Sequence, residues 1–191
     1  MLIAALTSAA LVPALAVLHD TTGAGGFASG FMHPLTGLDH ALAMIAVGLW
    51  GAQLRRPAVV VLPVAFPLAM ACGAFLGFSG VELSSVESRI ALSAILLGLA
   101  VMFEVRLPLW MAMLLVSGFA IFHGYAHGTE LPHGEDGLRY SIGFVVSTGL
   151  LHAVGISIGL LHDIDWGRKL IRLLGGGVFV AGCWFLWSAM Q

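Results

Sequence analysis

Charged side chains are scarce in this sequence of 191 residues. Only 9% of the residues are Asp, Glu, Lys or Arg, whereas 59% are hydrophobic. Because soluble domains carry about 25% charged residues, this composition argues against a soluble domain and predicts an integral membrane protein. The net charge of −2 leaves no excess of basic residues, which argues against nucleic acid as a partner.

Two kinds of motif are also missing. The two cysteines, Cys72 and Cys183, lie far apart in apolar runs and form no CxxC pair. They therefore predict neither a disulfide framework nor a thiolate metal site. The glycine-rich patterns GxGxxG and GxxxxGK[ST], which cradle phosphates, do not occur in a suitable context. We therefore expect no bound nucleotide in this chain.

What the sequence does contain is a series of long apolar runs. The hydrocarbon core of a bilayer is about 30 Å thick, so a helix needs about 20 apolar residues to cross it. The sequence predicts an all-α, polytopic membrane helix bundle with six core transmembrane helices, at residues 30–52, 58–78, 90–105, 107–127, 139–161 and 169–189. Pro63 and Pro67 make the second of these a candidate irregular helix, a device that transporters often use.

A further apolar run occupies residues 1–18. Its Ala14-Leu15-Ala16 pattern is typical of a cleavable secretory signal peptide, but no basic residue precedes it. The alternative is a retained seventh helix at the N-terminus. Both interpretations leave the residues that follow on the outside of the membrane. We expect residues 19–191 to form a single transmembrane transport domain.

The basic residues predict the orientation of the helices. Two of them, Arg89 and Arg139, lie on one side of the predicted membrane. The other six lie on the opposite side: Arg55, Arg56, Arg106, Arg168, Lys169 and Arg172. The positive-inside rule makes the side with six basic residues cytoplasmic. The span at residues 30–52 then runs inward, and the span at residues 107–127 runs outward.

Ionisable residues form a first cluster in "HPLTGLDH", residues 33–40. Such groups cost from about 3 to more than 10 kcal/mol inside a membrane, so they predict a functional site. His33 and His40 are seven residues apart, two turns of a helix, so we expect them to share a face, with His40 about 10 Å deeper. Asp39 would point about 100° away from His40. Met44, one turn further along, is a candidate thioether ligand on an inward path.

A second cluster lies in "FHGYAHGTE", residues 122–130. His123 and His127 are four residues apart and share a helix face, which Glu130 extends at its outer end. Gly124 stands where the HExxH motif has its glutamate, so a metalloprotease is not predicted. Both clusters lie in the outer half of the membrane. Neighbouring helices would thus form a metal site from His33, Asp39, His40, His123, His127 and Glu130, whose imidazoles and carboxylates suit Ni²⁺, Co²⁺ or Zn²⁺.

Other polar residues are candidates for a pathway. His152 lies in the middle of the span at residues 139–161, where it is either a second coordination point or a packed histidine bonded to a neighbouring helix. Glu87 lies at the outer mouth of the span at residues 90–105, where it could collect cations. His19, Asp20 and His133 lie in outer segments and could attract metal loosely.

The motifs resemble those of the HupE/UreJ family of nickel permeases. The resemblance rests on "HPLTGLDH" followed by "AMIAVGLW", and on "FHGYAHGTE", and it covers nearly the whole chain. It implies secondary transport of Ni²⁺, or of Co²⁺, across a bacterial inner membrane for the maturation of hydrogenase or urease. It also implies roles for the following residues: His33, Asp39, His40, His127, Glu130, Phe66 and Glu87. In a bacterial inner membrane, the predicted orientation makes the site face the periplasm.

Two other functions remain open at this point. A membrane-embedded zinc-dependent hydrolase would use bound Zn²⁺ to activate water, assisted by Thr36, Ser141 or Ser147, and would need a lateral opening for a lipid substrate. A bis-histidine haem carrier would need two histidines on facing helices, such as His40 and His123. Besides the metal ion, membrane lipids are the only partners that the sequence predicts, and the oligomeric state is left open.

Overall fold

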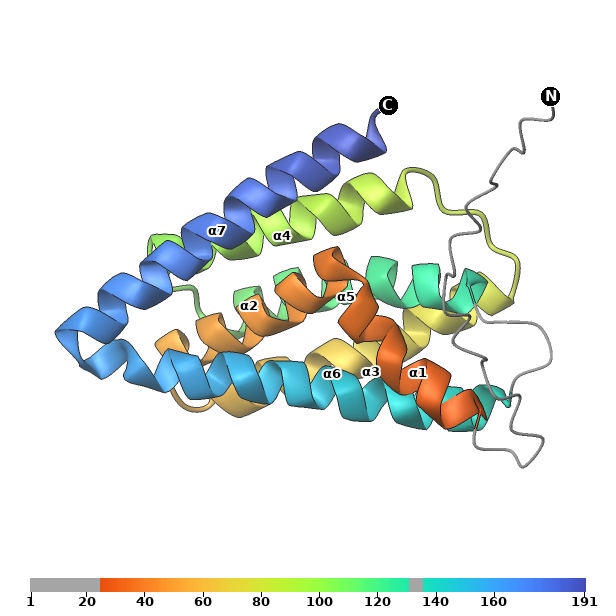
Figure 1. The fold of residues 1–191 in the computed structure, drawn as a ribbon, viewed down its shortest axis with the longest axis horizontal. Coiled ribbons are helices and arrows are strands. Elements are labelled where there is room, and N and C mark those ends of the chain that lie inside the picture. Colours follow the sequence, from red (N-terminus) through yellow and green to blue (C-terminus); the bar gives the residue numbers. More distant parts are fainter. Residues whose placement is uncertain (1–24, 131–135) are drawn as a thin grey trace, which may run out of the picture.

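The computed structural model describes residues 25–130 and 136–191. These residues form helices α1 (Gly25–Thr36), α2 (Leu38–Leu54), α3 (Ala58–Phe78), α4 (Val86–Met102), α5 (Leu109–Thr129) and α6 (Gly137–Gly159), the 3₁₀ helix η1 (Leu160–Asp163) and α7 (Asp165–Ala189) (Figure 1). The all-α prediction is confirmed. The predicted signal segment at residues 1–18 lies outside the described residues, as do His19, Asp20 and His133.

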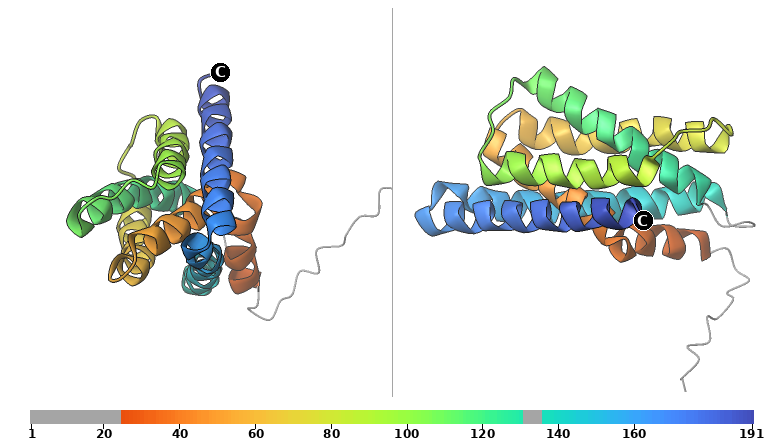
Figure 2. Two further views of the ribbon diagram at one scale, coloured as in Figure 1. Left: turned by 90° about the vertical axis from the view of Figure 1, so that its left-hand side faces the viewer. Right: turned by 90° about the horizontal axis from the view of Figure 1, so that it is seen from above.

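The helices pack as long neighbouring pairs. Helix α3 lies along α5, α4 lies along α7, and α6 lies along both α1 and α2 (Figures 1 and 2). Glycines allow these close approaches. A Cβ atom on Gly124 of α5 would collide with the backbone of Met70 on α3, and Gly48 of α2 faces Gly155 of α6 in the same way. Small residues commonly let helix backbones approach in membrane bundles.

Four of these helices are long and apolar enough to cross a membrane: α3, α5, α6 and α7. The α1–α2 pair would add a fifth span. Helix α4 has only 17 residues, which is below the length of about 20 that a spanning helix needs. The chain is therefore a multi-pass membrane protein, with four or five candidate spans among the described residues, where the sequence predicts six core spans. Pro63 and Pro67 lie inside α3, which runs from Ala58 to Phe78 without a break.

The predicted helix at residues 30–52 is not continuous. Helices α1 and α2 meet at an angle of 79°, and Gly37 between them has an extended backbone, with φ −83° and ψ 96°. Just before the break, the Thr36 hydroxyl donates to the His33 carbonyl over 2.9 Å, and such local bonds compete with the helical pattern. The prediction that His33 and His40 share one face of one helix is therefore wrong.

The connections that carry most of the basic residues share one end of the bundle, namely α2–α3, α4–α5 and α6–α7 (Figure 1). Ion pairs tie this end together. Arg55 pairs with Asp163. His162 Nε2 lies 3.1 Å from Glu104 Oε2, and Arg168 Nε lies 3.7 Å from Glu104 Oε1. These contacts join the C-terminal ends of α2 and α4 to η1 and to the start of α7.

Candidate metal site

Four histidines from three helices form a continuous row at the other end of the bundle. The ring of His33 on α1 lies 4.7 Å from that of His127 on α5, measured between ring centroids. The ring of His127 lies 4.5 Å from that of His40 on α2. The ring of His40 in turn lies 4.7 Å from that of His123 on α5. The bend at Gly37 makes this row possible, because it turns α1 so that both His33 and His40 reach His127.

Glu130 closes the exposed end of this row. It caps the C-terminus of α5, and its Oε2 lies 3.3 Å from His33 Nε2. His33, His127 and Glu130 each offer one possible ligand atom, and these three atoms all lie within 4.8 Å of one another. Ligands bound to one transition-metal ion at about 2 Å lie at most about 4 Å apart. Small side-chain rotations would therefore bring these three groups around a single ion.

Asp39 orients His40. Asp39 Oδ1 accepts a hydrogen bond from the His40 backbone N–H over 2.9 Å and lies 3.0 Å from His40 Nδ1. A carboxylate can only accept, so the proton of the neutral ring lies on Nδ1. His40 Nε2 is buried without a hydrogen-bond partner among the described residues, and its lone pair is available to a metal. The expectation that Asp39 points away from His40 is wrong, because its side chain turns back onto the ring.

Ser93 on α4 has a corresponding role toward His123. Its Oγ lies 2.6 Å from the Ile90 carbonyl oxygen and 2.9 Å from His123 Nε2. The single hydroxyl proton goes to the carbonyl, so Ser93 accepts from the ring N–H of His123. The lone pair of His123 is then on Nδ1, which is buried without a partner among the described residues. Sequence reasoning missed Ser93, because a lone serine in an apolar helix commonly bonds only its own backbone.

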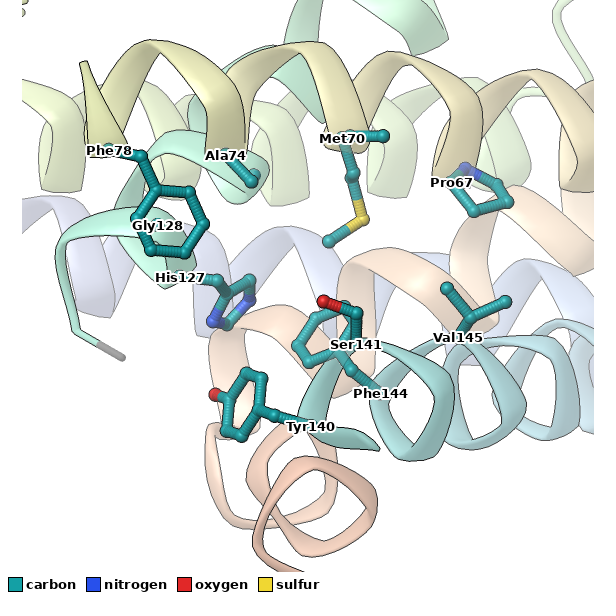
Figure 3. Close-up of a pocket in the computed structure, with 12 residues that line it drawn as sticks. Pro67, Met70, Ala74, Phe78, His127, Gly128, Tyr140, Ser141, Phe144 and Val145 are labelled. Carbon is teal, nitrogen blue, oxygen red and sulfur yellow. The ribbon is translucent and has the colours of Figure 1, made fainter. Parts of the chain in front are cut away.

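His127 occupies the centre of the row. It is 6% exposed, and neither of its ring nitrogens has a hydrogen-bond partner among the described residues. A buried polar group without a partner costs about 1–3 kcal/mol, so this ring is suited to binding a ligand. His127 also lines a cavity of about 110 Å³ between α3, α5 and α6, together with Met70, Tyr140 and Phe144 (Figure 3). The sequence alone does not single out these three residues, because they have no recognisable metal-binding pattern.

The four candidate pathway residues take different positions. Phe66 is fully buried on α3, with its ring 5.5 Å from that of His123 and 5.4 Å from that of His152. His152 is buried on α6 outside the row of four histidines. Met44 is fully buried in the core of α2. Glu87 is exposed in the first turn of α4, and its carboxylate is close enough to interact electrostatically with Asp39, His40 and Glu130.

The geometry argues against the two alternative functions. The rings of His40 and His123 are in direct contact, which leaves no space for a porphyrin between them. The cavity at His127, at about 110 Å³, is smaller than the pockets of about 300–1,000 Å³ that hold organic ligands. Its volume is too small for the lipid substrate that the hydrolase alternative requires.

Comparison with known proteins gives a consistent result. Residues 5–185 match the model of the family described as "HupE / UreJ protein". Protein HupE from Rhizobium leguminosarum bv. viciae is 43% identical over 177 residues, which cover 92% of this chain and 93% of that protein. No solved structure matches the chain.

Proposed function

This chain belongs to the HupE/UreJ family, and on that premise we propose that it is a permease that takes up divalent transition-metal cations. Ni²⁺ is the proposed substrate, with Co²⁺ and then Zn²⁺ as the next candidates, since all three suit imidazole and carboxylate ligands. The proposed binding site consists of His33, Asp39, His40, His123, His127 and Glu130. The metal would serve the maturation of a nickel enzyme such as hydrogenase or urease.

One observation carries this proposal. His40 Nε2, His123 Nδ1 and both ring nitrogens of His127 are buried without hydrogen-bond partners among the described residues. Buried polar atoms in proteins are nearly always paired, so several unpaired imidazoles in contact with one another favour a site that is completed by a ligand. Neutral imidazoles donate lone pairs to a metal ion but do not attract other cations strongly.

The site has the charge and the exposure that a transport substrate requires. Glu130 and Asp39 supply two carboxylates, which offset the charge of a divalent ion as it loses water. His33 and Glu130 have side chains that are 31% and 51% exposed, so an arriving ion meets them first. His123 is fully buried and stands at the inner end of the row. An ion would exchange water for imidazole step by step along this row.

We further propose that the site faces the periplasm of a bacterial inner membrane. Six of the eight basic residues lie toward the opposite end of the bundle, which the positive-inside rule assigns to the cytoplasm. The ion would therefore enter from the periplasm, where it arrives hydrated, and leave on the side of Arg55 and Arg168.

The test is ⁶³Ni²⁺ uptake into proteoliposomes that contain the purified chain. His127→Ala removes the central ligand and is expected to abolish uptake. Asp39→Asn keeps the shape of the side chain, removes its charge and weakens the orientation of His40. It is expected to lower uptake by about 10- to 100-fold, as the loss of an outer-shell partner usually does.

The matched control is Glu82→Gln, which neutralises an exposed carboxylate in the loop between α3 and α4. It is expected to leave uptake unchanged, whereas Glu130→Gln lowers it. Circular dichroism and size-exclusion chromatography check that each variant folds. Uptake at the wild-type rate by both His127→Ala and Asp39→Asn would contradict the proposal that the ion passes through this site.

A further inference from the structure

Beyond the proposed site, a second set of unpaired polar atoms lies deeper in the bundle. His152 on α6 is 2% exposed, and its Nε2 has no hydrogen-bond partner among the described residues. Thr148, one turn earlier on α6, is fully buried, and its Oγ1 also lacks such a partner. Two unpaired polar groups each cost about 1–3 kcal/mol. Packing alone does not account for an imidazole and a hydroxyl that are left unsatisfied side by side.

The ring of Phe66 separates His152 from the row of four histidines. Its centroid lies 5.5 Å from that of His123 and 5.4 Å from that of His152. No ring contact joins His123 and His152 within the described part of the chain. Phe66 is fully buried and contacts both histidine rings, so we call its ring the Phe66 partition between His123 and His152.

The face of α6 that carries His152 leads to the opposite end of the bundle. Positions three or four residues apart lie on one helix face, so Thr148, His152, Ile156 and Gly159 form a single stripe. Ile156 and Gly159 line a cavity of about 330 Å³ near the end of α2, together with Arg55, His162 and Asp163. At 1.5 Å per residue, Gly159 lies about 10 Å beyond His152. His152 therefore stands between the Phe66 partition and this cavity.

We propose that His152 and Thr148 form a second, inner binding station for a divalent transition-metal cation. This inference rests on the proposed function and extends it to the inward half of the path. His152 Nε2 binds the ion directly, because a neutral imidazole is a good ligand for such metals. The Thr148 hydroxyl bonds to a water molecule that the ion retains. Beyond this station, the next polar surroundings on the same face of α6 are those of the cavity at His162.

Cysteine substitution tests the station directly. A cysteine thiol at position 152, or one at position 148 that displaces the retained water, would lose its proton and bind Co²⁺ as the thiolate. Such a bond gives a sulfur-to-cobalt charge-transfer band in the near ultraviolet. The variants are His152→Cys and Thr148→Cys, in a full-length chain whose exposed native cysteines, Cys72 and Cys183, are replaced by serine. The matched control is Ser147→Cys, because Ser147 is also buried with an unpaired hydroxyl but lies about 140° around the helix from His152.

Spectra are recorded in detergent with Co²⁺ alone as the probe, and Co²⁺ uptake is measured in proteoliposomes. We expect the band with His152→Cys and with Thr148→Cys and its absence with Ser147→Cys. We also expect His152→Ala to lower the uptake rate by about tenfold, with the equilibrium Co²⁺ affinity of the outer site changed less than about twofold. A defect in folding alone would lower both the rate and the affinity.

The outcomes separate the two proposals. If the parent chain takes up Co²⁺ and neither cysteine variant gives the band, the inner station does not exist and the permease function stands. If Ser147→Cys gives the band as strongly as His152→Cys, Co²⁺ binds a buried cysteine on any face of α6. The proposal of an inner station is then overturned as well. If the parent chain neither binds nor takes up Co²⁺, the proposed function fails and the inner station fails with it.

Discussion

The hydroxyl oxygen of Ser93 on α4 lies 2.9 Å from Nε2 of His123 on α5. This contact fixes the tautomer of a fully buried imidazole and directs its Nδ1 lone pair away from α4. Partners of this kind, which orient a metal ligand without touching the metal, typically contribute 10- to 100-fold to metal affinity.

Replacing Ser93 by alanine is therefore expected to weaken Ni²⁺ binding by about 10-fold, because the His123 ring loses the acceptor that holds its N–H. The measurement is a competition titration of the purified chain against a chelator. The matched control is Ser157→Ala on α6, since Ser157 is exposed and its hydroxyl donates to the Ala153 carbonyl of its own helix. Equal affinities for Ser93→Ala and wild type would show that His123 needs no such support.

Helix α1 is positioned by a close backbone contact that a single methyl group would disturb. A Cβ atom at Gly30 would collide with the backbone of Tyr140 on α6. We expect Gly30→Ala to push α1 away from α6, to lower stability by about 1–3 kcal/mol and to weaken Ni²⁺ binding, because His33 moves away from His127. Thermal unfolding in detergent and a chelator titration measure both effects.

The control for this prediction is Gly149→Ala on α6. No atom lies within 4 Å of a Cβ atom built at Gly149, and alanine favours a helix by up to about 1 kcal/mol over glycine. Gly149→Ala should therefore unfold at the same temperature as wild type or a higher one. A loss of stability as large as that of Gly30→Ala would point to a general intolerance of substitution at helix glycines.

Glu104 contacts both His162 and Arg168 at the end of the bundle that carries most of the basic residues. Its side chain is 21% exposed and that of His162 is 8% exposed; pairs in such partly shielded positions are screened less by salt than surface pairs. We expect Glu104→Gln to lower the free energy of unfolding by about 1 kcal/mol. Glu82→Gln, at an exposed loop position, serves as the control in thermal unfolding experiments. An unchanged unfolding temperature for Glu104→Gln would assign no stabilising role to this network.

The proposed orientation predicts which loops are accessible from outside. With Cys72 and Cys183 replaced by serine, a membrane-impermeant maleimide should label Ser84→Cys in the α3–α4 loop of intact cells. It should label Asp165→Cys at the start of α7 only after the membrane is opened. Both positions are exposed on the protein surface. The reverse pattern would place the metal site at the cytoplasmic face.

The fold could be predicted from the sequence where one helix is one apolar run. The predicted span at residues 58–78 coincides with α3, and the spans at residues 107–127, 139–161 and 169–189 lie within a few residues of α5, α6 and α7. The run at residues 30–52 predicts one straight helix and is in fact bent, because hydropathy is the same for a straight helix and for a bent one. The bend depends on Gly37 and on packing of α1 against α6, which is a tertiary contact.

The candidate site could be predicted as a set of residues but not as an arrangement. Polar groups in apolar helices are costly, and this cost identifies the histidines of α1, α2 and α5 one by one. Their order in the row depends on the bend. The contact of Asp39 with His40 depends on a side-chain rotamer at the start of α2, and the contact of Ser93 depends on α4 packing beside α5. Helical spacing contains neither kind of information.

The bend at Gly37 also separates one histidine of the row from the other three. Of the four histidines in the row, only His33 belongs to α1, and the other three belong to α2 and α5. A rotation of α1 about Gly37 would therefore remove one imidazole from around an ion. The three histidines on α2 and α5 would keep their positions. The same rotation would weaken ion binding and would move His33, the most exposed histidine of the row. Release of a bound ion and rearrangement of the exposed end of the row would then be coupled in a single movement of α1.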